Sequence, residues 1–351
     1  MKVARTLSFE RTEVEDAPVP ALQPGDALVR VLACGLCGSD ASRWYVETKV
    51  PTVLGHEPVG IVVEAARGCA LEPGQRVFFH HHVHCDECPA CRGGFETNCA
   101  LFKRSRLDPG GFAELVRVPA ENARRDTLVL PERVSSDAAT FIEPLGCCVR
   151  AVNKLPLRGG ESVLLIGLGA MGLANGCLAR LAGAGRVIGS DFSAVRRERA
   201  LQPPWGFDAA LDPGDPGFAE SLRELTGGRG PDHAVVGPAS GAALEQGLRA
   251  VAPGGTVVLF SPFSPAAKVP VDLHRLYFGE LTLTASYSCA AKETRRALEL
   301  IAGGQVPVEA LVSHRLPLEG VGEGILRTAA AGDDWLKAIV YPNGVEREAG
   351  R

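Results

Sequence analysis

The hydrophobic and polar positions of the chain follow two different patterns, and the change lies near residue 160. In the first 150 residues, short runs such as Ala27–Val31 and Val59–Glu64 alternate in polarity, and turn pairs such as Pro73-Gly74 separate them. Alternation with a period of two is typical of strands that bury one face. This part of the chain is therefore predicted to be a β-rich barrel or sandwich.

From about residue 160, buried-type strands alternate with helical stretches. Ser162–Ile166 is a largely apolar strand pattern, and Leu173–Leu181 is rich in Ala and Leu, which favours a helix. Further elements are expected at Arg186–Gly189, Ala234–Val236, Ala243–Val251 and Thr256–Phe260, with edge strands at Lys268–Asp272 and Leu281–Thr284. Strand–helix–strand repetition of this kind builds a parallel, doubly wound sheet.

The chain has 351 residues, a length that suggests two domains. Its last stretch, from about Ser286, combines a helical pattern at Lys292–Ala302 with short strands such as Ala338–Tyr341. We interpret this stretch as a return to the first domain. The predicted organisation is a β-rich domain of residues 1–152 and 286–351 and an α/β domain of residues 153–285.

Composition and charge exclude several classes of protein. The 37 Lys and Arg residues face 41 Asp and Glu residues, so the chain lacks the basic surface that nucleic acid requires. No apolar run approaches the roughly 20 residues that span a bilayer, and none at the N-terminus has signal-peptide length. Eleven cysteines, several of them clustered, fit metal ligands in a reducing compartment. We therefore expect a cytoplasmic protein without nucleic-acid or membrane partners.

Four cysteines in the segment 84–100 are spaced C-x2-C-x2-C-x7-C. They are Cys85, Cys88, Cys91 and Cys99. Four thiolates at this spacing can surround one Zn²⁺ at about 2.3 Å and leave no position for a substrate, which makes the metal structural. Two disulfides, four unrelated thiols and a zinc-ribbon nucleic-acid module are the alternatives, the last disfavoured by the charge balance.

A glycine-rich turn follows the strand pattern at Ser162–Ile166 and reads G-x-G-x-x-G. It consists of Gly167, Leu168, Gly169, Ala170, Met171 and Gly172. After a strand and before a helix, this pattern is typical of a dinucleotide-binding turn, with the helix N-terminus facing the pyrophosphate. A glycine-rich turn without a ligand is the alternative.

Asp191 lies 19 residues after Gly172, at the end of the second predicted strand. A carboxylate at this position accepts hydrogen bonds from ribose hydroxyls and repels a 2′-phosphate, so NAD is favoured over NADP. Arg196, and Arg197 beside it, could weaken this repulsion of a 2′-phosphate, although both side chains are expected to be mainly solvated.

Three dispersed elements carry further candidate ligands. Cys37 lies in G-L-C-G-S-D, His56 and Glu57 lie in G-H-E-P, and Glu143 lies in E-P-L-G. Each residue alone is compatible with ordinary core packing. In a chain that already carries a four-cysteine site and a dinucleotide turn, they indicate a second metal site.

Six motifs in order give the chain a resemblance to a known family. They are G-L-C-G-S-D, G-H-E-P-V-G, the four-cysteine lobe, G-G-F-A-E, E-P-L-G and G-L-G-A-M-G. The chain resembles the zinc-dependent medium-chain dehydrogenases over nearly its full length, and is most similar to their polyol (sorbitol-like) and threonine dehydrogenase branch. The resemblance implies a GroES-like β-rich catalytic domain together with a Rossmann domain.

The resemblance also implies roles for individual residues. Cys37 and His56 match the two constant ligands of the catalytic zinc, and Glu57 and Glu143 match carboxylates that ligate the metal or stand behind it. Ser39 matches the hydroxyl that begins the proton relay. Asp40, in the same motif, matches the carboxylate that orients the histidine ligand. Two zinc ions per chain, one catalytic and one structural, are therefore expected.

The resulting prediction is a zinc-dependent oxidoreductase that transfers a hydride between a secondary alcohol and NAD. Polyols, sugar alcohols and cyclitols, or the corresponding ketones, are the expected substrates. L-Threonine 3-dehydrogenase activity is the alternative within the family. A non-catalytic, zinc-stabilised NAD-binding module is the alternative from another class.

Two further features remain open in the sequence. His80, His81, His82 and His84 would place alternate side chains on one face if they formed a strand, where they could contact substrate or simply pack. The two expected edge strands of the Rossmann sheet could pair across a two-fold axis, since exposed edges favour pairing. A homodimer or homotetramer is therefore expected.

Overall fold

The computed structural model describes residues 1–345, and their contacts form two compact units. Unit 1 contains Met1–Gly146 and the segment that begins at Cys289, and unit 2 contains Cys147–Ser288. The expected boundaries at residues 152 and 286 lie within a few residues of these divisions. Residues 346–351 of the expected first domain lie outside the described residues.

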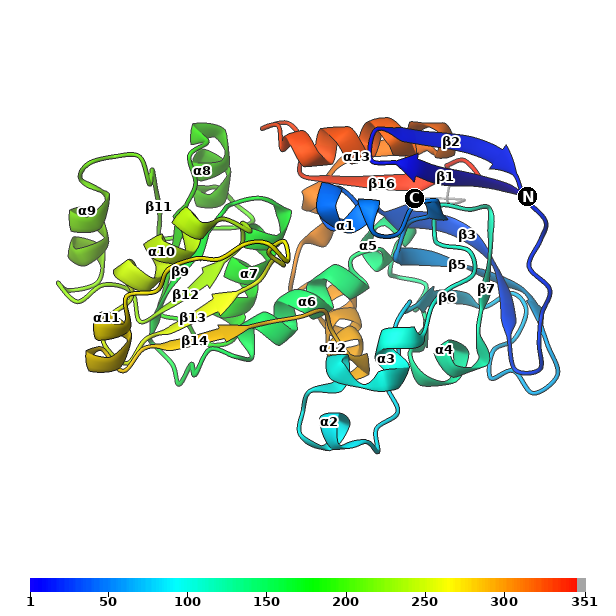
Figure 1. The fold of residues 1–351 in the computed structure, drawn as a ribbon, viewed down its shortest axis with the longest axis horizontal. Coiled ribbons are helices and arrows are strands. Elements are labelled where there is room, and N and C mark those ends of the chain that lie inside the picture. The colour runs from blue at the N-terminus through cyan, green and yellow to red at the C-terminus, as the bar shows by residue number, and fades with distance from the viewer. Residues whose placement is uncertain (346–351) are drawn as a thin grey trace. The chain divides into compact units, whose positions relative to one another are not determined.

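Unit 1 is built on two sheets. The larger has seven strands in the order β15-β16-β3-β5-β6-β8, with β7 pairing to β3, and the smaller has the order β2-β1-β4. The strands are β1 (Lys2–Ser8), β2 (Arg11–Asp16), β3 (Ala27–Gly35), β4 (Thr52–Val53), β5 (Glu57–Ala65), β6 (Arg76–Phe79), β7 (Leu115–Val118), β8 (Thr127–Val129), β15 (Val312–Pro317) and β16 (Lys337–Tyr341). Strands β3, β5 and β6 lie side by side in Figure 1, and only the β15–β16 pair of the larger sheet is parallel. This mixed sheet is the GroES-like fold expected of the first domain.

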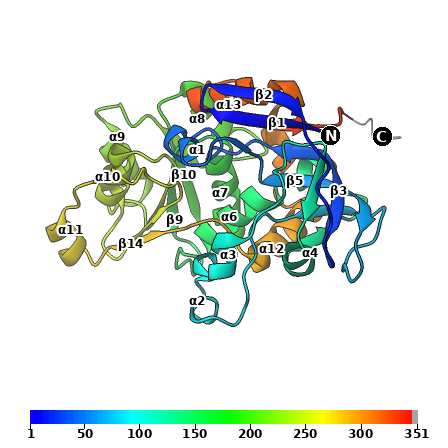
Figure 2. The same cartoon turned by 45° about the vertical axis from the view of Figure 1, so that its right-hand side comes forward.

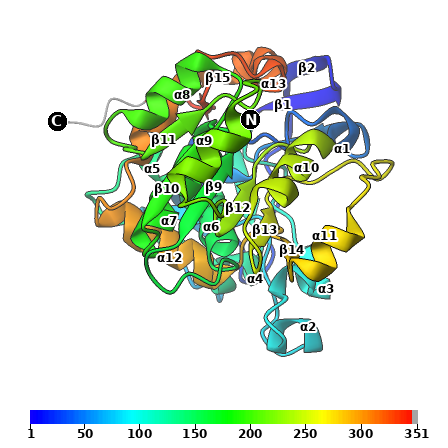
Figure 3. The ribbon, with the colours of Figure 1, turned by 90° about the vertical axis from the view of Figure 1, so that its left-hand side faces the viewer.

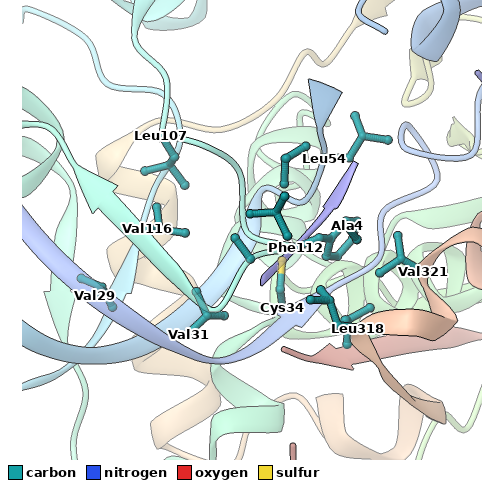
Figure 4. Packing of buried hydrophobic residues seen from close by; sticks show 14 of the residues in the cluster. Ala4, Val29, Val31, Cys34, Leu54, Leu107, Phe112, Val116, Leu318 and Val321 are labelled. Atoms are coloured by element: carbon teal, nitrogen blue, oxygen red, sulfur yellow. The ribbon is translucent and has the colours of Figure 1, made fainter. Parts of the chain in front are cut away.

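The core of unit 1 fills the space between these sheets. Val29 and Val31 on β3 alternate toward it, as the period-two pattern predicted, and Cys34 joins them after a register shift that follows Val31. These residues pack with Phe112 and Leu318 (Figure 4). Because Leu318 comes from the C-terminal stretch, the last part of the chain completes this core, as expected.

Short helices surround the sheets of unit 1. They are α1 (Arg43–Glu47), α2 (Pro89–Arg92), α3 (Ala100–Arg104), α4 (Ala120–Arg125), α5 (Ser136–Ala139), α12 (Ala291–Ala302) and α13 (Val321–Ala330), with 3-10 turns η1 (Glu96–Asn98), η2 (Val308–Leu311) and η3 (Leu318–Gly320). Helix α13 lies beside the β1–β2 hairpin (Figure 2). The lobe with α2 and α3 has little apolar material, so metal ligation is the natural source of its stability.

Unit 2 contains a six-stranded parallel sheet in the order β11-β10-β9-β12-β13-β14 (Figure 3). Its strands are β9 (Ser162–Ile166), β10 (Arg186–Ser190), β11 (Ala209–Leu211), β12 (His233–Val236), β13 (Thr256–Leu259) and β14 (Thr282–Ala285). Its helices are α7 (Ala170–Leu181), α8 (Ala194–Leu201), α9 (Phe218–Leu225), α10 (Gly241–Ala250) and α11 (Leu273–Phe278), and α6 (Ile142–Val152) leads into it. This is the doubly wound Rossmann sheet that the alternating pattern predicted.

One local prediction is wrong, and the condition attached to another is not met. Lys268–Asp272 is not a strand, because Pro270 lacks an amide donor and Asp272 instead caps helix α11 by accepting a hydrogen bond from Arg275 N. The histidines from His80 onward do not continue a strand, because β6 ends at Phe79. They therefore do not alternate between two faces of the sheet. The expected strand at Leu281–Thr284 is confirmed as β14, at the edge of the sheet.

Candidate active site

The four cysteines of the lobe gather around one point. Sγ–Sγ distances are 3.5 Å for Cys88–Cys91, 3.6 Å for Cys85–Cys99 and 4.0 Å for Cys85–Cys91. A tetrahedral zinc with bonds of about 2.3 Å would place its sulfur ligands about 3.8 Å apart. All eleven cysteines are free thiols, so the pairs at these distances are not disulfides. The donor set fits a structural zinc.

Local backbone supports this lobe. Pro89 opens helix α2 directly after Cys88, and Cys99 occupies the N-cap of α3. Main-chain amides of Leu101 and Phe102 point to the Cys99 thiol. Burial alone would raise the pKa of Cys99, but these amides outweigh it and lower that pKa to about 6. Cys99 is thereby prepared to act as a thiolate ligand.

A second group of donors lies at the carboxyl end of β3 and the start of β5. Ligand atoms of Cys37, His56 and Glu57 lie within 4.8 Å of one another. Cys37 follows β3 by two residues, and His56 immediately precedes β5, so two adjacent antiparallel strands bring the side chains together. Thiolate, imidazole and carboxylate donors fit zinc with a position left for substrate.

Two glycines make room for this group. A Cβ at Gly55, whose φ is +94°, would lie 2.8 Å from the amide nitrogen of Phe112. A Cβ at Gly35 would lie 1.9 Å from Oε2 of Glu57. The G-H-E motif therefore carries its glycine for the turn, and Gly35 leaves space for the Glu57 carboxylate.

Asp40 orients His56. Its Oδ1 lies 3.3 Å from Nδ1 of His56, and its Oδ2 accepts a hydrogen bond from the amide of Cys37 at 3.3 Å. Burial would lower the pKa of His56, but the charges of Asp40 and Cys37 outweigh it and raise that pKa well above its usual value. With Nδ1 held by Asp40, Nε2 is the nitrogen available to a metal.

Glu57 forms a buried ion pair with a lysine. Lys337 on β16 places Nζ 2.7 Å from Oε1 and 2.5 Å from Oε2, although only the Oε1 contact has hydrogen-bond geometry. Burial would lower the pKa of Lys337, but the charge of Glu57 outweighs it and raises that pKa. Glu57 is therefore an ion-pair partner of Lys337 as well as a member of the donor group.

Glu143 lies in the first turn of α6 and is almost fully buried. One oxygen of its carboxylate lies within 4.8 Å of a ring nitrogen of His80 and of Sγ of Cys289. Its charge also acts on Glu57 and Lys337, which places it near the first donor group. Ser39 is half-buried in the turn between Cys37 and Asp40.

Three consecutive histidines have different environments. His80 is fully buried, and although burial would lower its pKa, the charges of Cys289 and Asp126 raise it well above the usual value. His81 packs with its ring centroid 4.9 Å from that of His56, and burial lowers its pKa well below the usual value. Burial likewise lowers the pKa of His82 to about 2. His81 and His82 are therefore neutral polar groups at physiological pH.

The glycine turn of unit 2 has the geometry of a dinucleotide cradle. Gly167 has φ of +89°, and a Cβ at Gly172 would lie 1.9 Å from the carbonyl oxygen of Gly167. Apart from its own chain neighbours, no atom of the described residues lies within 4 Å of the position that a Cβ would take at Gly169, the N-cap of α7. The turn therefore keeps an open approach to the helix N-terminus, where a pyrophosphate fits.

Asp191 directly follows β10, and its side chain contacts the glycine turn. Its Oδ2 accepts a hydrogen bond from the amide of Leu168 at 2.8 Å, and its Oδ1 accepts one from Ser193 at 2.9 Å. Arg196 lies with Nη1 3.9 Å from Oδ2. The expectation that Arg196 and Arg197 are solvated is wrong, since their side chains are only 15% and 20% exposed and face Asp191 and Asp212.

Comparison with known proteins places this geometry in a family. The models "Alcohol dehydrogenase GroES-like domain" and "Zinc-binding dehydrogenase" match residues 23–128 and 170–303. L-Threonine 3-dehydrogenase of Pyrococcus furiosus is 33% identical over 86% of this chain and 87% of its own length. The chain belongs to the zinc-dependent medium-chain dehydrogenase/reductase family. It is thus an NAD(P)-dependent alcohol dehydrogenase of a zinc-binding type.

Two more members of the family show the range of similarity. Sorbitol dehydrogenase of Bacillus subtilis is 27% identical, over 98% of both chains. A zinc-binding dehydrogenase from Sinorhizobium meliloti, with a crystal structure bound to NADP, has a TM-score of 0.86 and 31% identity over 97% of this chain and 99% of its own. The polyol and threonine dehydrogenase branch that the motifs indicated is confirmed.

Some residues of the site were not found from the sequence. Lys337, Asp126 and Cys289 are distant from every motif, and each meets its partner only through the fold. The sole signal for Lys337 is a charged residue that begins an otherwise apolar strand. Among the residues described, no helix is long and apolar enough to cross a membrane.

Proposed function

We propose that this dehydrogenase oxidises a secondary alcohol of a polyol, sugar alcohol or cyclitol, with NAD as the preferred acceptor. The observation that carries the proposal is the convergence of Cys37 and His56, with Asp40 holding Nδ1 of His56. This arrangement presents a thiolate and an oriented imidazole nitrogen at one point. A zinc ion bound there would polarise a substrate hydroxyl as a Lewis acid.

The chain's own residues have distinct roles in this proposal. Cys37, His56 and Glu143 hold the catalytic zinc, while Glu57 stays paired with Lys337 and sets the charge behind it. Ser39 accepts the proton of the substrate hydroxyl and passes it outward. Cys85, Cys88, Cys91 and Cys99 hold the structural zinc.

Neutral polar groups near His56 support a polyhydroxylated substrate. His81 and His82 carry no charge at physiological pH, so they can hydrogen-bond a second hydroxyl without attracting a carboxylate. The name of the sorbitol dehydrogenase relative agrees with this substrate class. L-Threonine is the second candidate, and the 33% identity to the Pyrococcus furiosus enzyme favours it.

Asp191 supports the preference for NAD. Its carboxylate is fixed by two main-chain amides at the end of β10, where a 2′-phosphate would meet a negative charge. Arg196 lies beside it and reduces that repulsion only in part.

A homodimer or homotetramer is part of the proposal. Strand β14 forms one edge of the unit 2 sheet and pairs only with β13 among the described residues. Leu273, Tyr277 and Phe278 on α11 are 71%, 77% and 71% exposed, and covering them would remove apolar surface from water. Sedimentation at micromolar concentration should give at least the dimer mass; a monomer mass would contradict this part.

The cytoplasm is the proposed location. Both proposed zinc sites include cysteine ligands, which must be reduced to bind the metal, and all eleven cysteines are free. Localisation of a tagged full-length chain tests this directly, and a chain recovered with disulfides between the lobe cysteines would contradict it.

The test of the function is NADH formation at about 340 nm with polyols, cyclitols, L-threonine and simple alcohols, each with NAD and NADP. We expect turnover with a polyol or cyclitol and NAD. Cys37→Ser should lose turnover and one zinc per chain while keeping the circular-dichroism spectrum. Turnover confined to L-threonine would replace the substrate assignment, and turnover retained in Cys37→Ser would overturn the ligand assignment.

A further inference from the structure

A third cluster of potential metal-ligating side chains lies inside unit 1, and the sequence did not predict it. Ligand atoms of His80, Glu143 and Cys289 lie within 4.8 Å of one another. His80 directly follows β6, Glu143 lies in the first turn of α6, and Cys289 lies in the segment before α12. His80 and Cys289 are 0% exposed and Glu143 is 4% exposed, so all three side chains are shielded from bulk water.

The ring of His80 is oriented from behind by a carboxylate. Nδ1 of His80 lies 2.7 Å from Oδ2 of Asp126, and Oδ1 of Asp126 accepts a hydrogen bond from the hydroxyl of Thr294 at 2.7 Å. Histidines that bind metals almost always have their second ring nitrogen held in this way. The Asp126–His80 pair therefore directs Nε2 of His80 toward the cluster.

The contact that Nε2 makes inside the protein is poor. Its neighbour is Sγ of Cys289 at 3.8 Å, while that thiol also faces the carbonyl oxygen of Glu143 at 3.5 Å. Sulfur is a weak hydrogen-bonding group, so this contact compensates only weakly for the burial of the imidazole nitrogen. Hydrogen bonding within the protein core thus explains only in part why His80 and Cys289 face each other.

The distances match a metal position more closely. A tetrahedral ion bound to a thiolate at about 2.3 Å and to an imidazole at about 2.05 Å would separate sulfur from nitrogen by about 3.6 Å. The observed 3.8 Å lies close to this value, and the Glu143 carboxylate is in range to complete the set. Sulfur, nitrogen and oxygen donors together suit a borderline divalent ion such as Zn²⁺ or Co²⁺.

We propose that His80, Glu143 and Cys289 form a third zinc-type site of this chain, next to the catalytic position, with the Glu143 carboxylate shared between the two. The proposal goes beyond the proposed function, because it concerns the number and place of bound metals rather than the substrate. It raises the metal content from two to three ions per chain.

Metal analysis of the full-length protein tests the proposal. The protein is equilibrated with Zn²⁺, freed of unbound metal by dialysis, and its zinc is counted per chain by mass spectrometry. We expect three ions in the wild type, two in Cys289→Ala and three in Cys34→Ala. Cys34 is the matched control, since it is a fully buried thiol in the same unit outside the cluster.

Two results would overturn the third site: two ions in the wild type, or three ions in Cys289→Ala. If Cys289→Ala does not fold by circular dichroism, ¹¹³Cd NMR of the cadmium-loaded wild type replaces it. Three resonances are then expected, and two would overturn the site. The substrate panel is measured separately, so an active enzyme with two ions disproves this site and leaves the proposed function intact.

Discussion

The ammonium of Lys337 and the carboxylate of Glu57 form a buried ion pair, with Nζ 2.7 Å from Oε1, between strands that are 280 residues apart in the chain. Their side chains are only 6% and 0% exposed. The pair joins β16 to β5 and fixes the charge directly behind Cys37 and His56.

Loss of Lys337 should therefore destabilise the protein strongly. Lys337→Met leaves the Glu57 carboxylate buried without a counter-charge, at a cost of about 3–5 kcal/mol. Denaturant unfolding of the zinc-loaded protein measures this loss. The double variant Lys337→Met/Glu57→Gln should recover part of it, and a double variant as unstable as Lys337→Met alone would contradict the pairing.

Cys91→Ala should remove the structural zinc and leave the catalytic donors in place. The lobe has few apolar contacts, and structural zinc contributes on the order of 10 kcal/mol of binding free energy in small peptides. We expect one zinc fewer per chain and a lower melting temperature. Cys69→Ala, a half-buried cysteine outside the lobe, is the control. An unchanged zinc content in Cys91→Ala would contradict the site.

Asp191→Asn should shift cofactor preference toward NADP. The substitution removes the negative charge near the ribose and keeps one oxygen to accept from Leu168 or Ser193. We expect the ratio of kcat/KM for NAD over NADP to fall about tenfold, which corresponds to about 1.4 kcal/mol. Steady-state kinetics with both cofactors measures the ratio. The same ratio in variant and wild type would show that the ribose contact lies elsewhere.

His81→Phe should weaken binding of a polyol without affecting a simple alcohol. Phenylalanine keeps the packing against His56 and removes both ring nitrogens. A lost hydrogen bond of about 1 kcal/mol would raise KM for the polyol about fivefold and leave kcat nearly unchanged. A secondary alcohol with one hydroxyl is the control substrate. An equal change for both substrates would assign His81 to packing.

The hydrogen bonds of Asp232 should make the free energy of unfolding of unit 2 depend on pH. Its Oδ2 accepts hydrogen bonds from the amide and hydroxyl of Ser162 at 2.8 and 2.7 Å. Burial would raise the pKa of Asp232, but these bonds outweigh it and lower that pKa. The stabilisation is therefore complete above the unfolded value of about 3.9 and is lost as pH falls through the folded pKa.

Asp232→Asn should accordingly cost about 1–2 kcal/mol at pH 7 and progressively less below about pH 4. Fluorescence of the buried Trp205 follows unit 2 when Trp44 and Trp335 are replaced by Phe. The exposed Asp215→Asn is the control for the loss of one charge. A difference that is constant with pH would show that Ser162 does not stabilise the charged form.

Sequence patterns were sufficient to predict the parts of the site that come from short motifs or from neighbouring strands. Gly167–Gly172 and Asp191 follow successive parallel strands, so their pattern predicted their proximity. The cysteines of the lobe are close in sequence, and their spacing alone predicted a set of four zinc donors. Cys37 and His56 could be joined only through family resemblance, since eighteen residues separate them and no local rule brings them together.

The amino-acid sequence by itself predicted most of the strands and helices, a division into two units, and the short motifs that are candidates for binding phosphate and zinc, because these depend on periodicity and spacing. Only the tertiary structure decided that Lys337 pairs with Glu57, and that His80 meets Cys289 in front of Asp126. Those contacts join residues from distant strands and helices. Their energies depend on burial, which is a property of the folded chain and not of any local stretch.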